Sequence, residues 1–325
     1  MRYLKRGIEV LGNSFKIAKD LHKRFGFSLC GLYYDILRAR LLYGASEEDY
    51  MAMEFYRKSH KEQSGYNTFR RNFVEFFNAF YEKSSVELFD DKSKFIDVFA
   101  NYIIHDVLFT GEKSAEEIEQ FIAKHETIVV KPILGCEGVG VYKLNMNDIA
   151  KKEELFALIN NGSHFVLEEC IVQHPKTAEL NPSSVNTVRV ETIIDAEGEV
   201  HITNSVCIMG TTSSIVNNTH SGGIMCHIEP DTGIFDSFGR NPKGELYFRH
   251  PATNIVLPGY RLPNWEGVLE YAKSLAKVVP SARKIGWDIV ILENGYDIIE
   301  GNVRPGHCTQ ACDGRPRYKL EKSLI

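Results

Sequence analysis

The sequence lacks several features that would place it in a specialised class of proteins. No apolar run approaches the length of a membrane span, and the seven cysteines are odd in number and scattered, which does not suit a disulfide framework. The net charge is -5 over 325 residues, so there is no general electrostatic reason to expect nucleic acid as a partner. The N-terminus has no uninterrupted apolar stretch followed by a cleavage site, so we expect no signal peptide. These absences predict a cytoplasmic protein.

Basic residues are concentrated at the start of the chain. Residues 1–24 contain seven Lys or Arg against two acidic residues, a local charge of +5, which leaves -10 for the remainder. Apolar residues in this segment recur at three- and four-residue steps and gather on one face of a helix: Leu4, Ile8, Leu11, Phe15 and Ala18. Two interpretations are open. The helix contacts an anionic membrane surface, which would place the protein at the inner membrane face, or its apolar stripe packs on the next helix, which we favour.

Hydrophobic periodicity divides the chain into a helical beginning and a strand-rich remainder. Residues 1 to about 85 show helical spacing, with a second helix from about residue 29 and an aromatic stripe between residues 69 and 80. From residue 126 the pattern predicts strands, a hairpin over residues 186–209 and a further helix over 266–278. There is no internal repeat. The predicted class is α+β, with a helical N-terminal region followed by antiparallel sheets.

A glycine-rich turn follows the strand that ends near Lys131. Gly135, Gly138 and Gly140 let the backbone turn sharply and bring N–H groups close to an anion. No GxxxxGK[ST] motif is present, and the residues after the glycines continue as a strand, whereas a dinucleotide fingerprint requires a helix there. What remains is a glycine hairpin able to fold over a triphosphate above Lys131. The alternative is a plain β-hairpin with a loose loop.

The most informative stretch is the acidic hairpin GWDIVILENGYDIIEGNVRPG, residues 286–306. It carries Asp288, Glu300 and Asn302 on strands that are otherwise rich in Ile and Val. Three oxygen donors at one end of a hairpin suit Mg²⁺, whose coordination is usually completed by phosphates and water. The alternative is three polar residues near strand ends, each solvated.

Strand register decides whether these side chains converge, because neighbouring residues point to opposite faces. A two-residue turn at Asn294 and Gly295 would pair Asp288 with residue 301 and place Glu300 on the opposite face. A three-residue loop over 293–295, with Gly295 left-handed, would pair Asp288 with Glu300 and put Asn302 on the same face. The sequence permits both turns, and we predict the second.

Taken together, these segments resemble the ATP-grasp superfamily, and within it the sugar-transfer-associated group. That group has a similar NTVR strand (186–189), a GWD start to the acidic hairpin (286–288) and an EGN-x-RPG ending (300–306). The loop NNTHSGG (217–223) is similar to the NLHRGG loop of ribosomal-protein glutamate ligases. The resemblance covers about residues 88–310. It implies a helical region over 1–87, a first subdomain with a glycine-rich flap over 88–166, and a second subdomain with the hinge and metal-binding hairpin over 167–325.

The resemblance also implies a role for each residue that matches the family pattern. ATP phosphates would contact the two lysines and the flap: Lys92, Lys131, Gly135, Gly138 and Gly140. Adenine would meet the backbone of the hinge: Glu168, Glu169, Cys170 and Ile171. Glu179 is assigned to the ribose, although Lys176 lies near the position where the acidic residue is expected. Mg²⁺, for which Mn²⁺ can substitute, would bind Asp288, Glu300 and Asn302. The transferring phosphate or the acyl substrate would contact Arg189, Arg304, Asn218 and His220. Ser221 replaces an arginine of the glutamate ligases, which puts their acidic amino-acid substrate in doubt.

The activity implied is that of an ATP- and Mg²⁺-dependent carboxylate–amine ligase that forms an acylphosphate. The acid would be a small molecule or saccharide, such as a sugar acid or a cell-surface polysaccharide precursor, and the second substrate an amine. An ATP-grasp kinase or phosphotransferase and a non-catalytic nucleotide-binding protein are the alternatives. A zinc site built from His307, Cys308 and Cys312, with Cys226 and His227, is a further alternative; the loose H-C-x₃-C spacing favours ordinary thiols instead. The substrates and the oligomeric state are not readable from the sequence.

Overall fold

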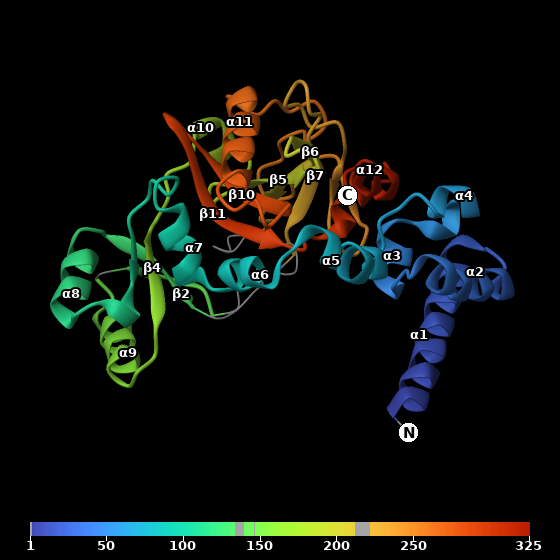
Figure 1. Cartoon of the computed structure of the whole chain (residues 1–325), viewed down its shortest axis with the longest axis horizontal. Helices are drawn as coiled ribbons and strands as arrows, with labels where there is room; N and C mark the ends of the chain where they lie inside the picture. The colour runs from blue at the N-terminus through green and yellow to red at the C-terminus, as the bar shows by residue number, and fades with distance from the viewer. Residues whose placement is uncertain (1, 134–139, 146, 212–221) are drawn as a thin grey trace. The chain divides into compact units, whose positions relative to one another are not determined.

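The structure, a computed structural model, describes residues 2–133, 140–145, 147–211 and 222–325 and divides into two units. Unit 1 combines Met1–Phe80 with Gly306–Ile325, and unit 2 contains Tyr81–Pro305. The described residues form helices and two antiparallel sheets, so the predicted α+β class is confirmed (Figure 1). The predicted boundaries near residues 87 and 166 stay predictions.

Unit 1 is helical and draws on both ends of the chain. Its first long helix is confirmed, and it buries Ser14, Ala18 and Leu21, whereas Ile8 and Leu11 are 64% and 46% exposed. Membrane contact through this helix stays a prediction. No described helix is long and apolar enough to cross a bilayer. The elements are α1 (Arg2–Phe25), α2 (Leu29–Tyr43), α3 (Glu47–Ala52), η1 (Phe55–Arg57), α4 (His60–Gln63), η2 (Arg71–Glu75), α5 (Phe77–Phe80), η5 (His307–Ala311) and α12 (Tyr318–Ser323).

The smaller sheet of unit 2 has four strands in the order β1-β4-β2-β3. Alternation along β2 buries Ile128 and Val130 against two helices, so Lys131 belongs to the opposite face of the sheet. Figure 1 shows these helices, α8 and α9, beside the strands. The elements are β1 (Val107–Phe109), η3 (Thr110–Glu112), α8 (Ala115–Ala123), β2 (Thr127–Pro132), β3 (Tyr142–Asn145), α9 (Ile149–Asn160) and β4 (Phe165–Glu169).

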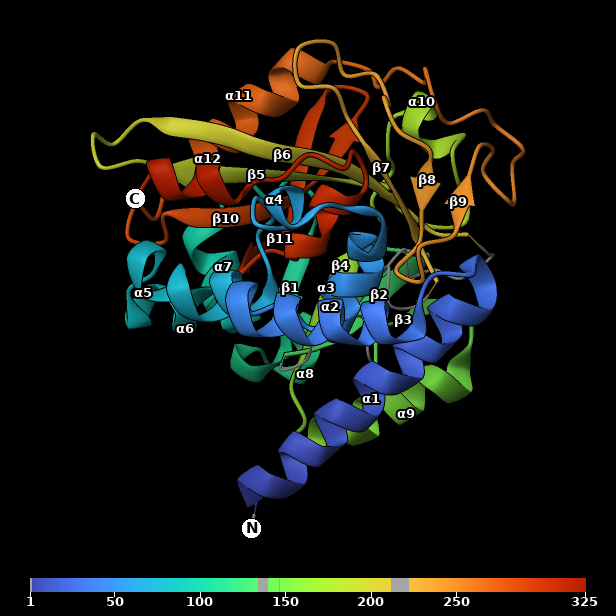
Figure 2. The ribbon, with the colours of Figure 1, turned by 90° about the vertical axis from the view of Figure 1, so that its right-hand side faces the viewer.

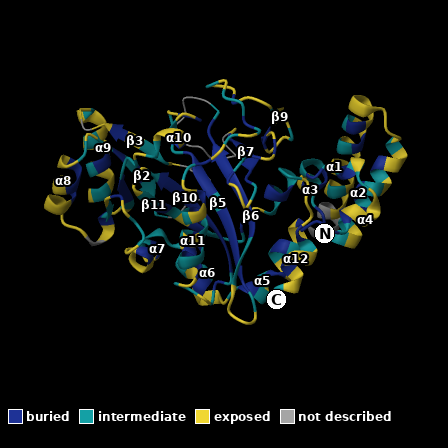
Figure 3. Ribbon diagram, turned by 90° about the horizontal axis from the view of Figure 1, so that it is seen from above, coloured by how far each residue is buried: buried dark blue, intermediate teal, exposed yellow. Residues whose placement is uncertain are grey.

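The larger sheet of unit 2 has seven strands in the order β11-β10-β5-β6-β7-β8-β9, and its central strands lie side by side in Figure 2. One face packs against α11, the helix that was predicted over residues 266–278, through residues such as Val190, Trp287 and Val268. These strands are largely buried, as Figure 3 shows. The alternate residues, among them Arg189 and Asp288, belong to the opposite face. The elements are α6 (Lys83–Asp90), α7 (Lys92–Phe99), α10 (Pro175–Ala178), β5 (Thr187–Ile194), β6 (Val200–Met209), β7 (Ile224–His227), β8 (Gly239–Arg240), β9 (Leu246–Tyr247), α11 (Trp265–Ala276), β10 (Lys284–Leu292) and β11 (Gly295–Val303).

Gly301 lets the acidic hairpin pack tightly on an aromatic cluster. A Cβ atom at this position would lie 2.6 Å from a ring carbon of Phe89 and 2.9 Å from a ring carbon of Trp287. We expect Gly301→Ala to lower the free energy of unfolding by about 1–3 kcal/mol, because overpacking forces buried rings off their rotamers. Urea denaturation measures this change. Gly12→Ala is the control, since its added Cβ meets no heavy atom within 4 Å beyond its chain neighbours and the adjacent backbone of its own helix; equal unfolding midpoints for the two variants would contradict the expectation.

Candidate nucleotide and metal site

The acidic hairpin pairs its two carboxylates as predicted. Asp288 of β10 lies opposite Glu300 of β11, and Asn302 lies two residues further along the same face. The predicted three-residue loop over 293–295 is wrong. Leu292 pairs with Gly295, which leaves a two-residue turn at residues 293 and 294. An irregularity in the register between Asp288 and Ile289 restores the pairing, since Ile289 lies opposite residue 298 and residue 299 is extra. The bulge, rather than a longer loop, brings the two carboxylates together.

Arg189 from the adjacent strand completes a row of charged side chains across the sheet. It pairs with Asp288 in register, and its Nε and Nη2 atoms each donate a 2.7 Å hydrogen bond to a different carboxylate oxygen. Both side chains are largely buried, at 19% and 10% exposure. Burial alone would lower the pKa of the Arg189 guanidinium, but the Asp288 carboxylate outweighs it and raises that pKa. The row therefore holds a permanent positive charge beside the two carboxylates.

Glu300 and Asn302 supply the remaining oxygen donors. Asn302 donates from Nδ2 to Asp288 at 3.4 Å, which directs its amide toward the carboxylates. The Glu300 side chain is accessible to solvent, yet the protein around it restricts its hydration, and this effect together with the charge of Asp288 raises the pKa of Glu300. Two carboxylates fit a hard cation such as Mg²⁺, which would relieve the repulsion between them, and Asn302 would present its amide oxygen to the ion after a half-turn of the amide group. The donor set thus suits the predicted metal.

Lys131 approaches this row from the smaller sheet. Its ammonium group forms an ion pair with Glu168 of β4, and it is close enough to Glu300 to stabilise that carboxylate. Burial would raise the pKa of Glu168, but Lys131 and then His105 outweigh it and lower the pKa to about 2. Glu168, predicted only as a hinge residue that offers its backbone, therefore also holds the lysine through its side chain.

Sequence reasoning missed two residues that position this lysine. Asp297 of β11 accepts hydrogen bonds from the backbone N–H and the ring Nδ1 of His105, at 3.0 and 2.8 Å. His105 Nε2 in turn lies 3.7 Å from Glu168. The four buried charges alternate in sign from Asp297 to Lys131. Asp297 directly precedes Ile298 and Ile299 on its strand, and a carboxylate beside apolar residues was the signal in the sequence for its role.

The stability of this network should depend on pH. Burial lowers the pKa of His105, but its bonds to Asp297 and Glu168 outweigh burial and raise the pKa to about 9, above the usual 6.5. A raised pKa in the folded state means that His105 stabilises the fold fully below pH 6.5 and loses this contribution as pH rises through about 9. We expect the free energy of unfolding to fall over that interval, and to fall less steeply in His105→Gln. Chemical denaturation at several pH values measures both slopes; parallel curves for the two proteins would contradict this assignment.

The other predicted site residues occupy varied surroundings. Lys92 donates to the carbonyl oxygen of Ile133 at 3.3 Å, just beyond β2, and so lies at the start of the predicted flap. Arg304 has a left-handed backbone with φ of +59°, and its Nη2 atom lies 3.6 Å from Oδ2 of Asp90. Glu179 pairs with Lys176 at 2.9 Å and accepts a hydrogen bond from a tyrosine hydroxyl. Its assignment to the ribose stays a prediction.

The structure describes the predicted hinge and one end of the predicted flap. The predicted hinge strand ends at Glu169, and Cys170 and Ile171 follow it without regular structure. Gly140 has φ of +77°, and a Cβ there would lie 2.9 Å from a side-chain carbon of Pro132, so this end of the flap requires glycine. The remaining predicted residues lie outside the described part of the chain: Gly135, Gly138, Asn218 and His220.

Comparisons with known proteins give one family match and several structural similarities. A model of the sugar-transfer associated ATP-grasp family matches residues 70–316. No protein of curated function matches the sequence. Among solved structures, the chain is similar to ATP-grasp ligase PsnB complexed with a minimal precursor, at 16% identity and a TM-score of 0.47, over 75% of this chain and 64% of that one.

Two further structures show the same degree of similarity. D-alanyl-alanine synthetase A from Vibrio cholerae has 14% identity and a TM-score of 0.47, over 74% of this chain and 65% of that one. The ADP complex of purK, an N5-carboxyaminoimidazole ribonucleotide synthetase, has 16% identity and a TM-score of 0.44, over 68% of this chain and 46% of that one. The chain thus spans between about half and two thirds of the length of these proteins.

Proposed function

Since the chain belongs to the sugar-transfer associated ATP-grasp family, we propose that it is an ATP- and Mg²⁺-dependent ligase that joins a carboxylic acid to an amine. The observation that carries the proposal is the charged row of Arg189, Asp288 and Glu300, with Lys131 close to Glu300. Phosphoryl transfer depends on positioning and on neutralising charge, so it requires no protein nucleophile. This row supplies both signs of charge at one place.

Each charged group has a role that follows from its position. Asp288, Glu300 and Asn302 would hold Mg²⁺, which supplies positive charge to the phosphate oxygens and orients them when it is bound. Lys131 offsets the negative charge of the transferring phosphate, and Glu168 holds its ammonium group in place. Arg189 is fixed by two hydrogen bonds to Asp288, so its guanidinium is oriented before substrate arrives. A preorganised charge requires little rearrangement during the reaction.

The proposed reaction has two steps. A carboxylate oxygen of the acid attacks the γ-phosphorus of ATP, the bond to the β,γ-bridging oxygen breaks, and ADP leaves with that electron pair. The amine nitrogen then attacks the acyl carbon of the acylphosphate, the carbon–oxygen bond to phosphate breaks, and inorganic phosphate leaves. One proton from the amine passes to solvent. Because the family is associated with sugar transfer, we propose that the acid is a sugar acid or a precursor of a cell-surface polysaccharide.

A screen for ADP release across pairs of acids and amines tests this proposal. Uronic acids and amino-acid amines are the first candidates, and the Asp288→Asn protein serves as the control for contaminating ATPases. We expect ADP release to require both an acid and an amine, with one phosphate released per amide formed. Stoichiometric phosphorylation of a single hydroxyl acceptor, with no amine required, would instead assign a kinase. ATP binding without turnover for any pair would also contradict the ligase.

A further inference from the structure

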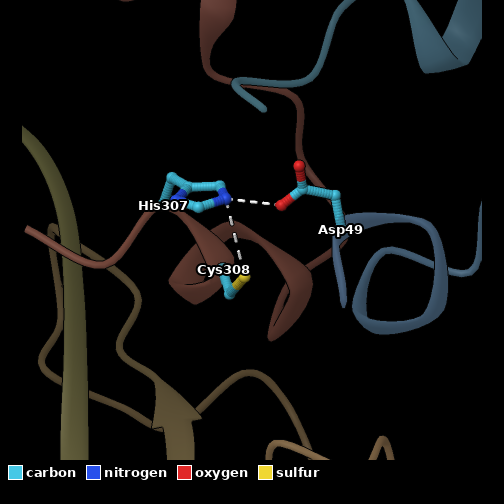
Figure 4. Close-up of side chains that lie close together, drawn as sticks. All are labelled: Asp49, His307 and Cys308. Carbon is cyan, nitrogen blue, oxygen red and sulfur yellow. Dashed lines mark hydrogen bonds and ion pairs between the residues drawn. The ribbon is translucent and has the colours of Figure 1, made fainter. Parts of the chain in front are cut away.

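Three side chains with metal-binding atoms come together in unit 1, on elements that are far apart in the sequence. Asp49 lies on α3, whereas His307 and Cys308 lie on η5 (Figure 4). Their ligand atoms all lie within 4.8 Å of one another. His307 Nε2 is 2.5 Å from Asp49 Oδ1 and 3.8 Å from Cys308 Sγ. Neither ATP binding nor the proposed ligation uses this cluster.

The surrounding structure holds two of the three side chains in fixed orientations. The second carboxylate oxygen of Asp49 accepts hydrogen bonds from the backbone N–H groups of Ser46 and Phe69, at 2.7 and 2.8 Å, which directs the first oxygen toward His307. The imidazole ring packs edge-to-face against Phe73, with ring centroids 5.8 Å apart. Asp49 is fully buried, and the His307 side chain is only 9% exposed. Ligands that are already oriented lose little conformational freedom on binding an ion.

The geometry differs from that of a proton relay. In a relay the carboxylate contacts one ring nitrogen and the nucleophile contacts the other. Here the carboxylate and the thiol both approach Nε2, while the buried Nδ1 has no hydrogen-bond partner among the described residues. Three donor atoms that cluster within 4.8 Å of one another, rather than in a line through the ring, are the arrangement that a shared ion requires. The cluster therefore fits ligation better than nucleophilic catalysis.

We propose that Asp49 Oδ1, His307 Nε2 and Cys308 Sγ bind a zinc ion. The combination of thiolate, imidazole and carboxylate is typical of zinc and unsuited to Mg²⁺ or Ca²⁺. With bonds of about 2.0 Å to nitrogen and 2.3 Å to sulfur, a tetrahedral ion separates these two atoms by about 3.5 Å, close to the 3.8 Å observed here. The 2.5 Å contact between Asp49 and His307 must open by roughly 1 Å to admit the ion. Three protein ligands leave a fourth position for water.

The consequence is a link within unit 1 between α3 and the segment that follows the acidic hairpin. Asp49 and His307 are 258 residues apart, and a metal that joins such distant positions favours the folded state, since the unfolded chain lacks the site. The ligand set also differs from the one that the sequence suggested. Cys312 is replaced by Asp49, whose position in the chain gave no sign of this role. Cys226 is buried in the core of unit 2, and His227 pairs there with an aspartate.

Metal analysis of the full chain tests the proposal. Protein stripped with chelator, supplied with Zn²⁺ and then freed of excess ion should retain about one zinc per chain and melt at a higher temperature than the stripped protein. The bound zinc should be lost in Cys308→Ala and retained in the matched variant Cys312→Ala. It should also be retained in Asp288→Asn, which separates this site from the acidic hairpin. Cobalt substitution gives a second readout, because a thiolate-to-cobalt charge-transfer band should be present in Cys312→Ala and absent in Cys308→Ala.

Three results would overturn the zinc site. The first is a wild-type chain that folds after treatment with Zn²⁺ but retains no ion. The second is equal loss of zinc from Cys308→Ala and Cys312→Ala, and the third is loss from Asp288→Asn alone, since either would place the ion on other ligands. Circular dichroism of each variant establishes that it is folded. His307→Gln keeps both cysteines, so its zinc content is an independent test of the same site.

Discussion

Replacing Asp288 by Asn is expected to abolish the rise in melting temperature that Mg²⁺-ATP produces, and to lower the rate of ADP formation at least about 100-fold. Asparagine has nearly the same shape and still accepts hydrogen bonds, so the change removes chiefly the negative charge that would hold the metal. The same change leaves the guanidinium of Arg189 without its counter-charge. The ligand-free protein should therefore also melt at a lower temperature, because a buried charge that loses its partner is destabilising.

Glu300→Gln separates the loss of metal binding from the loss of stability. The pKa of Glu300 is raised in the folded protein, through restricted hydration and the charge of Asp288. A raised carboxyl pKa means that the ionised group costs stability at neutral pH. We therefore expect Glu300→Gln to melt at a higher temperature than the wild type without ligand, and to show no Mg²⁺-dependent shift with ATP. Differential scanning fluorimetry measures both effects.

Glu293→Gln is the matched control for these variants, because it removes one carboxylate from the exposed turn of the same hairpin. It should keep the wild-type response to Mg²⁺-ATP. If Mg²⁺-ATP raises the melting temperature of both Asp288→Asn and Glu300→Gln as much as that of the wild type, the metal binds elsewhere. If Glu300→Gln is stabilised but retains Mg²⁺-dependent ADP formation, only the proposed role of Glu300 as a metal ligand is contradicted.

Replacing Lys131 by Met is the second change with a large expected effect. The ammonium group is the positive charge that faces the acidic row from the smaller sheet, and its ion pair with Glu168 is largely buried. We expect ATP to bind roughly 30-fold more weakly or worse, since removing one partner of a buried charge pair costs about 2–5 kcal/mol. The variant should also be less stable near neutral pH, because the buried Glu168 carboxylate loses its main counter-charge. Isothermal titration calorimetry and thermal melting measure the two effects.

Lys124→Met is the control for Lys131→Met, since Lys124 lies exposed at the end of α8 in the same part of unit 2. It should leave ATP binding unchanged. Lys131→Arg keeps the charge but not the compact ammonium group, and it should recover part of the affinity. Equal ATP affinity in Lys131→Met and the wild type would remove Lys131 from the nucleotide site.

Local patterns in the sequence predicted the elements of the fold well. The spacing of apolar residues identified α1, α2 and α11, and alternation identified β2, β3 and the β5–β6 hairpin. These signals are local, because a helix or strand face repeats within a few residues. The grouping of Gly306–Ile325 with the N-terminal helices has no such signal. It depends on contacts between residues far apart in the chain, such as the hydrogen bond from Asn67 to Glu321.

The candidate site shows where sequence reasoning succeeds and where it ends. The pairing of Asp288 with Glu300 was predicted correctly, but by the wrong turn, because a β-bulge leaves little trace in the residues that form it. The network through His105 and Asp297 was missed, since it joins two sheets that no motif connects. The roles of the ATP- and metal-binding residues stay predictions.

A crystal structure with Mn²⁺ and a non-hydrolysable ATP analogue, with the metal located by its anomalous scattering, tests the proposed metal and nucleotide site most directly. We expect a metal peak about 2.2 Å from oxygens of Asp288, Glu300 and Asn302, in contact with the β- and γ-phosphates, with the ammonium of Lys131 facing the same phosphates. A nucleotide bound away from this hairpin, or a metal held by other residues while Asp288 remains paired only with Arg189, would contradict it.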